Sequence, residues 1–308
     1  MLWITFSPYG VSLFLIGHVF HAFFVIGIKK NNFSNDGMIL CGQRAKIIVS
    51  YIMSIIINII ASIYSTPSTY GVTFALFIIL YDLYYFNYIK KKPALPCLYY
   101  PSLYISLIAI IINILHSPPS FDNIGVTEVI HLLYSPVGSV LTFLYIVLQI
   151  IFALLSYQGF QIASVLNTSL SFASLNNFIK LIGNFITLTY RIENQFLIHM
   201  FYPFILSFTV SVILYFFAIK KAVTIEICGV YRGVYYFSYL VFQISSATLL
   251  FGEPMLLNPV QLGIFLSSAV LLVFSMFFMS CGAWSLFPSN RPRALYSQQQ
   301  QQQDMLPL

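Results

Sequence analysis

Charged residues are scarce in this sequence, and their scarcity excludes most soluble folds. Only 7% of the 308 residues are Asp, Glu, Lys or Arg, whereas a soluble domain carries about 25%. No charge occurs in the 51 residues between Glu128 and Lys180, or in the 37 residues between Glu253 and Arg291. With 59% hydrophobic residues in the chain, such stretches can cross a hydrocarbon core, which takes about 20 helical residues. The sequence therefore predicts an all-α integral membrane protein in contact with a lipid bilayer.

Other absences narrow the classes of function. The four cysteines lie far apart without a C-x-x-C pair, which argues against a zinc site or a redox motif. The net charge is +6, yet no basic stripe interleaved with aromatics lies between the apolar runs, so no nucleic-acid partner is expected. The sequence has no nucleophile elbow, phosphate loop or H-E-x-x-H motif. We therefore expect neither an enzyme nor a bound cofactor, and the sequence does not indicate an oligomeric state.

The two ends of the chain differ in character. The first apolar stretch lacks a basic n-region, so we expect a retained span and no cleaved signal peptide. Residues 289–308 are polar and include six consecutive glutamines, Gln298 to Gln303. Such a composition is typical of a disordered tail. The expected organisation is a polytopic transmembrane domain over residues 1–288 and a disordered tail over residues 289–308.

Apolar runs separated by polar breaks predict nine transmembrane helices. The sixth contains three asparagines and several serines, so we expect it to face protein or a cavity and not lipid. The predicted spans cover residues 8–28, 45–64, 68–87, 98–116, 137–157, 163–183, 197–219, 223–250 and 260–283.

The positions of Lys and Arg predict the orientation, because these residues favour the cytoplasmic side of short loops. Alternate loops and the tail contain 11 of the 14 basic residues. The opposite loops are poor in them: the loop after the fourth span has Glu128 and His131 but no Lys or Arg. Two exceptions, Lys180 and Arg191, lie near the loop after the sixth span. The sequence thus predicts an outside or lumenal N-terminus and a cytosolic C-terminus, in a plasma membrane or an endomembrane.

A weak internal repeat divides the predicted spans into two halves, residues 1–116 and 137–283. Spans two to four and seven to nine share an order in which one span leads through a short turn to an aromatic-rich span, and a further apolar span follows. In transporters, such repeats are related by a pseudo-two-fold axis and bracket a binding site near the membrane midplane. The pattern predicts a carrier with two pseudo-symmetric repeats.

Short motifs in and near the predicted spans are similar to those of a known transporter family. Val234-Tyr235-Tyr236-Phe237 and Ala247 to Glu253 are similar to the motifs I-Y-Y-V and S-A-I-L-F-K-E. Ile28-Lys29-Lys30 and Thr66 to Thr69 resemble the end of the first span and the turn before the third span of the same family. In these motifs the sequence resembles the NIPA-like magnesium transporters of the drug/metabolite transporter superfamily. The resemblance implies a nine-span fold, alternating access and Mg²⁺ as the transported ion. At the position of the family's second-span acidic residue this chain has Ile56, with Asn58 close by.

Charged residues inside predicted spans are the candidates for a transport site, because each costs about 2.5 to 3.5 kcal/mol on insertion scales and so faces a cavity or a partner. Asp82 and Arg232 lie at similar predicted depths, and we expect them to pair across the repeat axis, with Glu226 as an entrance carboxylate. Asp82, Glu226, Asn58 and Glu253 offer the oxygen ligands that Mg²⁺ takes, with Asp82 and Glu226 as the metal candidates. A structural ion pair, or an arginine that extends toward the cytosol, is the alternative interpretation.

Two further questions stay open at the level of sequence. Arg232 repels a cation unless it is neutralised, so a carrier of an organic or phosphorylated solute is the alternative to a magnesium transporter. A serpentine receptor is the alternative of another class, although it needs seven spans and not nine. His18 and His21 share a helix face and suit proton relay or metal binding, but without a third ligand the sequence favours packing histidines.

Overall fold

The computed structural model describes residues 8–33, 41–64, 67–84, 86–87, 93–116, 125–191, 194–199, 201–223, 229–251 and 257–283. The regular elements of these ranges are helices, without a strand among them. In chain order they are α1 (Pro8–Phe33), α2 (Cys41–Ile63), α3 (Pro67–Tyr84), α4 (Pro96–Leu115), α5 (Val126–Tyr134), α6 (Pro136–Tyr157), α7 (Gln161–Arg191), η2 (Gln195–Leu197), α8 (Phe201–Val223), α9 (Gly229–Phe251) and α10 (Pro259–Ala283). The predicted tail, residues 289–308, lies outside the described residues.

Six helices are long and apolar enough to cross a membrane: α1, α2, α4, α6, α8 and α10. The expectation of an all-α integral membrane protein agrees with this result. α3 contains a shorter apolar stretch, Tyr70–Tyr84, and α7 and α9 are not among the six. These three helices correspond to the third, sixth and eighth predicted spans, so the count of nine stays a prediction. α3 falls short of the membrane criteria because its apolar stretch is short. α7 is long but rich in serine and asparagine.

Contacts between helices show how their directions alternate. α1 and α2 form an antiparallel hairpin, α3 runs antiparallel to α9, α4 runs antiparallel to α10, and α7 runs parallel to α9. Two contacts fix the direction of each helix pair. They are Gly17–Asn58 and Gly27–Ile47 for α1 and α2, Gly71–Leu240 and Asp82–Arg232 for α3 and α9, Ser106–Ser275 and Asn113–Ser268 for α4 and α10, and Ser169–Ser238 and Asn177–Ser246 for α7 and α9.

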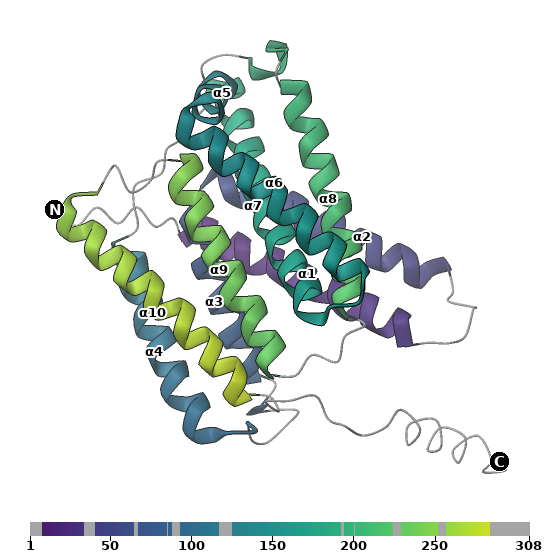
Figure 1. The fold of residues 1–308 in the computed structure, drawn as a ribbon, viewed down its shortest axis with the longest axis vertical. Coiled ribbons are helices and arrows are strands. Elements are labelled where there is room, and N and C mark those ends of the chain that lie inside the picture. Colours follow the sequence, from purple (N-terminus) through teal and green to yellow (C-terminus); the bar gives the residue numbers. More distant parts are fainter. Residues whose placement is uncertain are drawn as a thin grey trace.

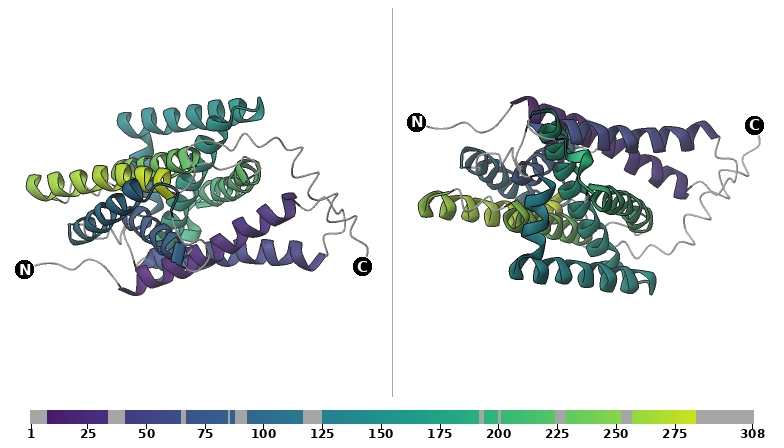
Figure 2. Two further views of the ribbon diagram at one scale, coloured as in Figure 1. Left: turned by 90° about the horizontal axis from the view of Figure 1, so that it is seen from below. Right: turned by 90° about the horizontal axis from the view of Figure 1, so that it is seen from above.

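The helices surround a central group formed by α3, α7 and α9 (Figure 1). α4 and α10 lie side by side on one flank of this group. The α1–α2 hairpin covers one side of the bundle and α6 the opposite side (Figure 2). The helices that meet the membrane criteria therefore enclose the three that do not.

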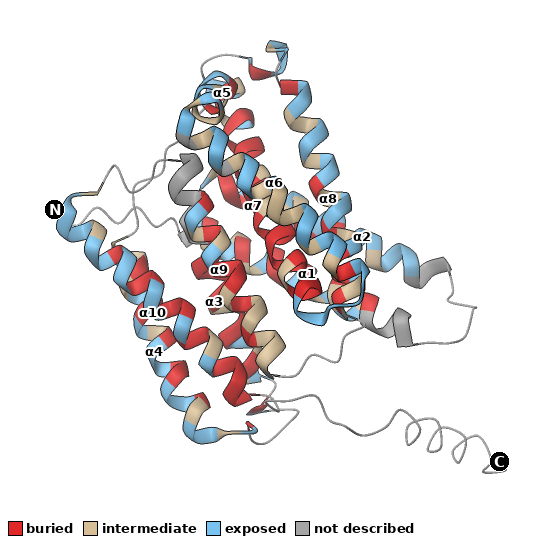
Figure 3. Cartoon of the chain, in the orientation of Figure 1, coloured by how far each residue is buried: buried red, intermediate tan, exposed pale blue. Residues whose placement is uncertain are grey.

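α7 is buried along most of its length although it is polar (Figure 3). Of its 31 residues 21 are buried, which confirms the expectation that the sixth span faces protein. The outer helices expose large apolar side chains, for example Phe143 and Leu154 of α6 and Phe217 of α8. A bundle with apolar residues outside and polar residues inside suits a hydrocarbon environment.

Two predicted boundaries were wrong. The sixth span was expected to end at residue 183, but α7 continues to Arg191, so Lys180 lies more than two turns before the end of the helix and Arg191 is its last residue. The loop expected after the fourth span contains α5. The carboxylate of Glu128 accepts a hydrogen bond from the backbone of Gly125 at 3.0 Å, which satisfies a donor at the helix start that has no partner within the helix.

Candidate functional site

Two charged side chains meet inside the bundle between α3 and α9. Asp82 lies in the last turn of α3 and its side chain is 0% exposed, while Arg232 lies in the first turn of α9 and keeps 14% of its side chain exposed. Nη2 of Arg232 donates a hydrogen bond to Oδ1 of Asp82 at 2.9 Å. The contact expected from the sequence is therefore present, and its role in transport stays a prediction.

Tyrosines surround the guanidinium group of Arg232. Its Nε donates a hydrogen bond to the Tyr236 hydroxyl at 2.7 Å. Its Cζ lies 5.3 Å from the Tyr236 ring centroid and 5.9 Å from that of Tyr81. Aromatic faces attract a cation at this range. The positive charge is thus stabilised by an ion pair, a hydrogen bond and two rings.

The carboxylate of Asp82 retains one oxygen for a further ligand. Oδ2 is buried without a hydrogen-bond partner, and so is the hydroxyl oxygen of Tyr99 on α4. Tyr99 is close enough to Asp82 and Arg232 to interact with both electrostatically. Burying a polar atom without a partner costs about 1 to 3 kcal/mol. A donor or a cation bound beside Oδ2 would remove this cost.

The other predicted site residues do not join this pair. Asn58 is buried, and its side-chain amide lies against Gly17 of α1. Its backbone carbonyl accepts a hydrogen bond from the Tyr70 hydroxyl at 3.2 Å. Tyr70 precedes Asp82 by 12 residues on α3, which corresponds to about 18 Å of helix. Asn58 therefore lies well away from Asp82 along α3, its candidacy for a transport site stays a prediction, and Glu226 and Glu253 lie outside the described residues.

A row of polar side chains joins α7 to α9, which we call the α7–α9 seam. Serine and asparagine residues of α7 form hydrogen bonds of 2.8 to 3.2 Å with serine, glutamine and tyrosine residues of α9. Two amide oxygens of the seam, Oδ1 of Asn176 and Oε1 of Gln243, are buried without a partner. The bonded pairs are Ser169–Ser238, Asn176–Tyr239, Asn177–Ser246 and Asn177–Gln243.

Lys180 adds a second cation inside the bundle, one turn beyond Asn177 on α7. Its side chain is 1% exposed, and Nζ donates a hydrogen bond to the backbone carbonyl of Ser62 at 2.7 Å. Ser62 is next to last in α2, where carbonyl groups have no donor within the helix. Lys180 therefore caps the end of α2, and its charge suits the negative end of the helix dipole.

An aromatic layer separates the side chains of Arg232 and Lys180. On α9, Ser246 follows Arg232 by 14 residues, or about 21 Å. Ser246 contacts Asn177, which lies one turn before Lys180 on α7. Between these levels the rings of Phe74, Phe172 and Tyr239 pack with centroids 4.6 to 5.5 Å apart. The polar and charged groups thus form two levels inside the bundle with aromatic side chains between them.

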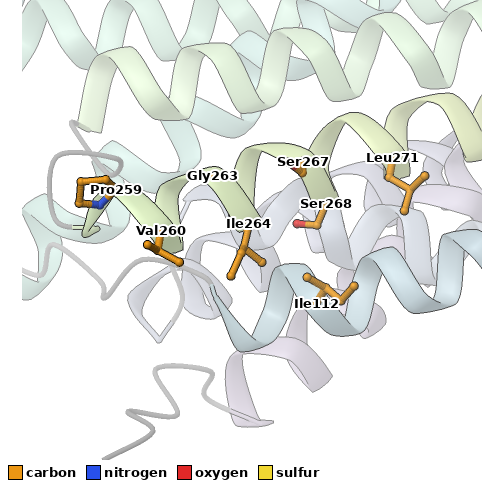
Figure 4. A pocket seen from close by; sticks show the side chains of 8 residues that line it. All are labelled: Ile112, Pro259, Val260, Gly263, Ile264, Ser267, Ser268 and Leu271. Carbon is orange, nitrogen blue, oxygen red and sulfur yellow. The ribbon is translucent and has the colours of Figure 1, made fainter.

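A groove of about 380 Å³ lies on the outer surface between α4 and α10 (Figure 4). Its lining is apolar apart from two serines. The groove contains no charged residue and none of the seam residues, so it is part of the apolar surface and not of the candidate site. The lining residues are Ile112, Pro259, Val260, Gly263, Ile264, Ser267, Ser268 and Leu271.

Sequence reasoning missed the seam and Lys180. The polarity of residues 163–183 was recognised, but Lys180 was interpreted only as a basic residue near the following loop, because the span was ended at residue 183. A helical reading of the same segment gives the missing signal: Asn176, Lys180 and Asn184 recur every four residues and share one face. No protein family matches this chain, and no curated protein or solved structure matches it.

Proposed function

We propose that this protein is a nine-span membrane carrier of the drug/metabolite transporter type that works by alternating access. Nine helices correspond to the predicted spans, and the contacts given above for seven of them fit alternating directions, which supports nine crossings rather than the seven of a serpentine receptor. The polar composition of α7 is compatible with a spanning helix, because the neighbouring helices cover it. The resemblance of the sequence motifs to NIPA-like transporters points to the same fold.

The observation that carries the proposal is the buried ion pair between Asp82 and Arg232. An ion pair inside a membrane protein is costly to bury and joins two helices that belong to different predicted repeats. In alternating access, one repeat moves against the other around a fixed site. We assign the pair the role of a gate that closes the α3–α9 contact and opens when a solute competes for one of the two charges.

The charges of the described residues favour an anionic solute. Arg232 and Lys180 place two cationic side chains inside the bundle, and Arg232 forms an ion pair with Asp82. Arginine binds carboxylate and phosphate groups through two parallel hydrogen bonds, and lysine binds them as a point charge. The amide groups of the α7–α9 seam add neutral donors and acceptors. An organic solute with a phosphate or carboxylate group suits this arrangement.

Magnesium transport is the second candidate, favoured by Oδ2 of Asp82. Mg²⁺ keeps several waters and needs one or two carboxylates. Oδ2 is buried without a partner, and Arg232 is neutralised by the other oxygen of the same carboxylate. The site can in this way accept a hydrated cation at Asp82 without exposing it to a free guanidinium charge.

Uptake into proteoliposomes of the purified protein tests both candidates. One set of vesicles contains a fluorescent Mg²⁺ indicator, and a second set receives radiolabelled glycerol 3-phosphate or phosphoenolpyruvate. We expect saturable organic-phosphate uptake that falls at least about tenfold in Arg232→Gln, since the loss of a charge-assisted contact of about 1.5 to 3 kcal/mol gives that factor or more. Arg191→Gln, an exposed change at the end of α7, is the matched control.

The outcomes separate the candidates. Mg²⁺ influx that Asp82→Asn abolishes would replace the anion proposal with the cation proposal. Uptake of neither probe above empty liposomes would contradict the assignment as a carrier of these solutes, while the helical bundle and its ion pair would remain.

A further inference from the structure

Two amide oxygens of the α7–α9 seam are buried without a hydrogen-bond partner at neighbouring turns of the bundle. They are Oδ1 of Asn176 on α7 and Oε1 of Gln243 on α9, and both residues are 0% exposed. Nδ2 of Asn176 donates a hydrogen bond to the Tyr239 hydroxyl at 2.8 Å. Gln243 follows Tyr239 by four residues on α9, which is about one helical turn. The seam thus presents two acceptors for which the described residues supply no donor.

The other hydrogen bonds of the seam decide which atom of Gln243 remains available. Oγ of Ser246 donates to the backbone carbonyl of Phe242 at 2.6 Å, so the same oxygen accepts the hydrogen bond from Nδ2 of Asn177 at 2.8 Å. Oδ1 of Asn177 then accepts from Nε2 of Gln243 at 3.2 Å. Each bond fixes the direction of the next, so Gln243 presents its carbonyl oxygen, which can only accept.

α3 passes next to the two acceptors on the side that α7 and α9 leave to it. A Cβ on Gly71 would lie 3.3 Å from the Leu240 side chain and 3.9 Å from Cγ of Gln243. About one turn further along α3, Phe74 packs on Tyr239 with ring centroids 4.6 Å apart, as part of the aromatic layer. The acceptors therefore lie beside that layer, among the three central helices (Figure 1).

This position suits a solute site. Asn176 is the middle residue of α7, which has 31 residues. α3 belongs to the first predicted repeat, and α7 and α9 belong to the second. Transporters built from two repeats bind their solutes near the membrane midplane, where the repeats meet. The two acceptors lie at such a place, whereas the Asp82–Arg232 pair lies on the other side of the aromatic layer.

The charges around the acceptors favour a neutral donor. An ammonium group would bring a positive charge close to Lys180, which follows Asn176 by one turn on α7. Among the described residues of α3, α7 and α9 the one carboxylate is that of Asp82, which lies beyond the aromatic layer. A buried cation without a counter-charge is unfavourable. A hydroxyl group donates a hydrogen bond without adding charge.

We propose that Asn176 and Gln243 bind hydroxyl groups of the solute, and that the solute is an organic phosphate with hydroxyls on its carbon chain. One hydroxyl donates to Oδ1 of Asn176 and another to Oε1 of Gln243. The phosphate group then lies toward Lys180, about 6 Å along α7 from Asn176. This assignment rests on the proposed function as a carrier of organic anions. A solute of equal length without hydroxyls leaves both oxygens without a donor, and a site of this kind rejects such an analogue.

Binding of two phosphate esters with the same three-carbon chain tests the selectivity without any transport. Glycerol 3-phosphate has two hydroxyls on its chain, and propyl phosphate has none. Isothermal titration calorimetry of the full-length protein in lipid nanodiscs gives the two dissociation constants. We expect glycerol 3-phosphate to bind at least about tenfold more tightly than propyl phosphate.

Two variants locate the hydroxyl contacts. Gln243→Met and Asn176→Leu keep side chains of similar size but remove the acceptor oxygens. Each should reduce the preference for glycerol 3-phosphate by about threefold or more, because one hydrogen bond is lost. Binding of propyl phosphate should change little, which also shows that the variant is folded. Gln158→Met, an exposed change at the end of α6, is the matched control and should keep the full preference.

The results separate this inference from the carrier proposal. Equal dissociation constants for the two esters in the wild type, or a preference that survives both variants, overturn the hydroxyl site, and the two oxygens then bind water only. Binding of neither ester overturns it as well, even if Mg²⁺ uptake shows that the protein is a carrier. If neither variant folds, the ratio of the two constants in the wild type decides. A preference that depends on Asn176 and Gln243 supports the site even if no ester enters proteoliposomes, and the carrier proposal then fails alone.

Discussion

Arg232 and Asp82 form a 2.9 Å ion pair although 150 residues separate them in the sequence. The pair connects the end of α3 to the start of α9, so it holds together parts of the chain that belong to different predicted repeats. Burying two charges costs several kcal/mol per ion before their attraction is counted. The tyrosines around the guanidinium and the complete burial of the carboxylate reduce the water that could screen the attraction.

Removing one partner of this pair should destabilise the fold more than removing both. Asp82→Asn leaves Arg232 without its counter-charge, and breaking a buried pair in this way costs about 3 to 5 kcal/mol. The double variant Asp82→Asn with Arg232→Gln leaves no uncompensated charge and should recover much of the lost stability. Thermal unfolding of the detergent-solubilised protein measures this. The unfolding temperature should be highest for wild type, lower for the double variant and lowest for Asp82→Asn.

Arg191→Gln controls for the loss of a positive charge at an exposed position of α7. It should shift the unfolding temperature little, because exposed charges contribute about 0 to 1 kcal/mol. If the losses of stability in Asp82→Asn and in Arg232→Gln simply added up in the double variant, Asp82 and Arg232 would not stabilise each other.

Composition and charge pattern were enough to predict the membrane setting, the polar interior helix and the contact between Asp82 and Arg232. Each of these follows from a local rule: apolar length, polarity within an apolar run, or the cost of a charge in a membrane. The role of Lys180 does not follow from a local rule, because its acceptor is a carbonyl of α2 that lies 118 residues earlier. The position of Asn58 depends in the same way on α1, whose Gly17 approaches its amide closely.

Lys180→Met should loosen the end of α2. The change keeps a long side chain in the site but removes the donor to the Ser62 carbonyl, and an unsatisfied buried acceptor costs about 1 to 3 kcal/mol. We expect a lower unfolding temperature and faster proteolytic cleavage in the short connection between α2 and α3. Lys180→Arg retains a cation and a hydrogen-bond donor, so it should lower the unfolding temperature less than Lys180→Met does. Equal unfolding temperatures for wild type and Lys180→Met would show that the hydrogen bond does not stabilise the helix end.

Glycine at the contact between α4 and α10 should be less replaceable than glycine on the outer surface. A Cβ at Gly282 would lie 2.6 Å from the backbone nitrogen of Tyr99, and Leu95 donates a hydrogen bond to the Gly282 carbonyl at 2.8 Å. Gly282→Ala therefore forces the helices apart, at a cost of about 1 to 3 kcal/mol. At Gly263 nothing lies within 4 Å of the added atom, so Gly263→Ala should leave stability unchanged or raise it by up to about 1 kcal/mol.

The two alanine variants differ by position within one helix, α10, and so share its composition and length. Unfolding temperatures of the purified proteins provide the comparison. A larger loss in Gly263→Ala than in Gly282→Ala would contradict the close packing of α10 against α4.

The crossing of α3 can be tested by labelling single cysteines on either side of it. Arg44 at the start of α2 and His131 on α5 are both exposed, and α2, α3 and α4 lie between them. Three crossings place the two positions on opposite sides of the membrane, whereas two crossings place them on the same side. α3 decides the result, because α2 and α4 meet the criteria for a span and α3 is a shorter apolar helix.

Arg44→Cys and His131→Cys are introduced separately into a variant whose four cysteines are replaced by serine. A membrane-impermeant maleimide applied to intact cells should label His131→Cys and should reach Arg44→Cys only after permeabilisation, because basic loops favour the cytosol. The cysteine-free protein controls for non-specific labelling. Both cysteines reacting from the same side would remove α3 from the crossings and reduce the count of spans, whereas labelling from opposite sides supports the alternation on which the carrier proposal depends.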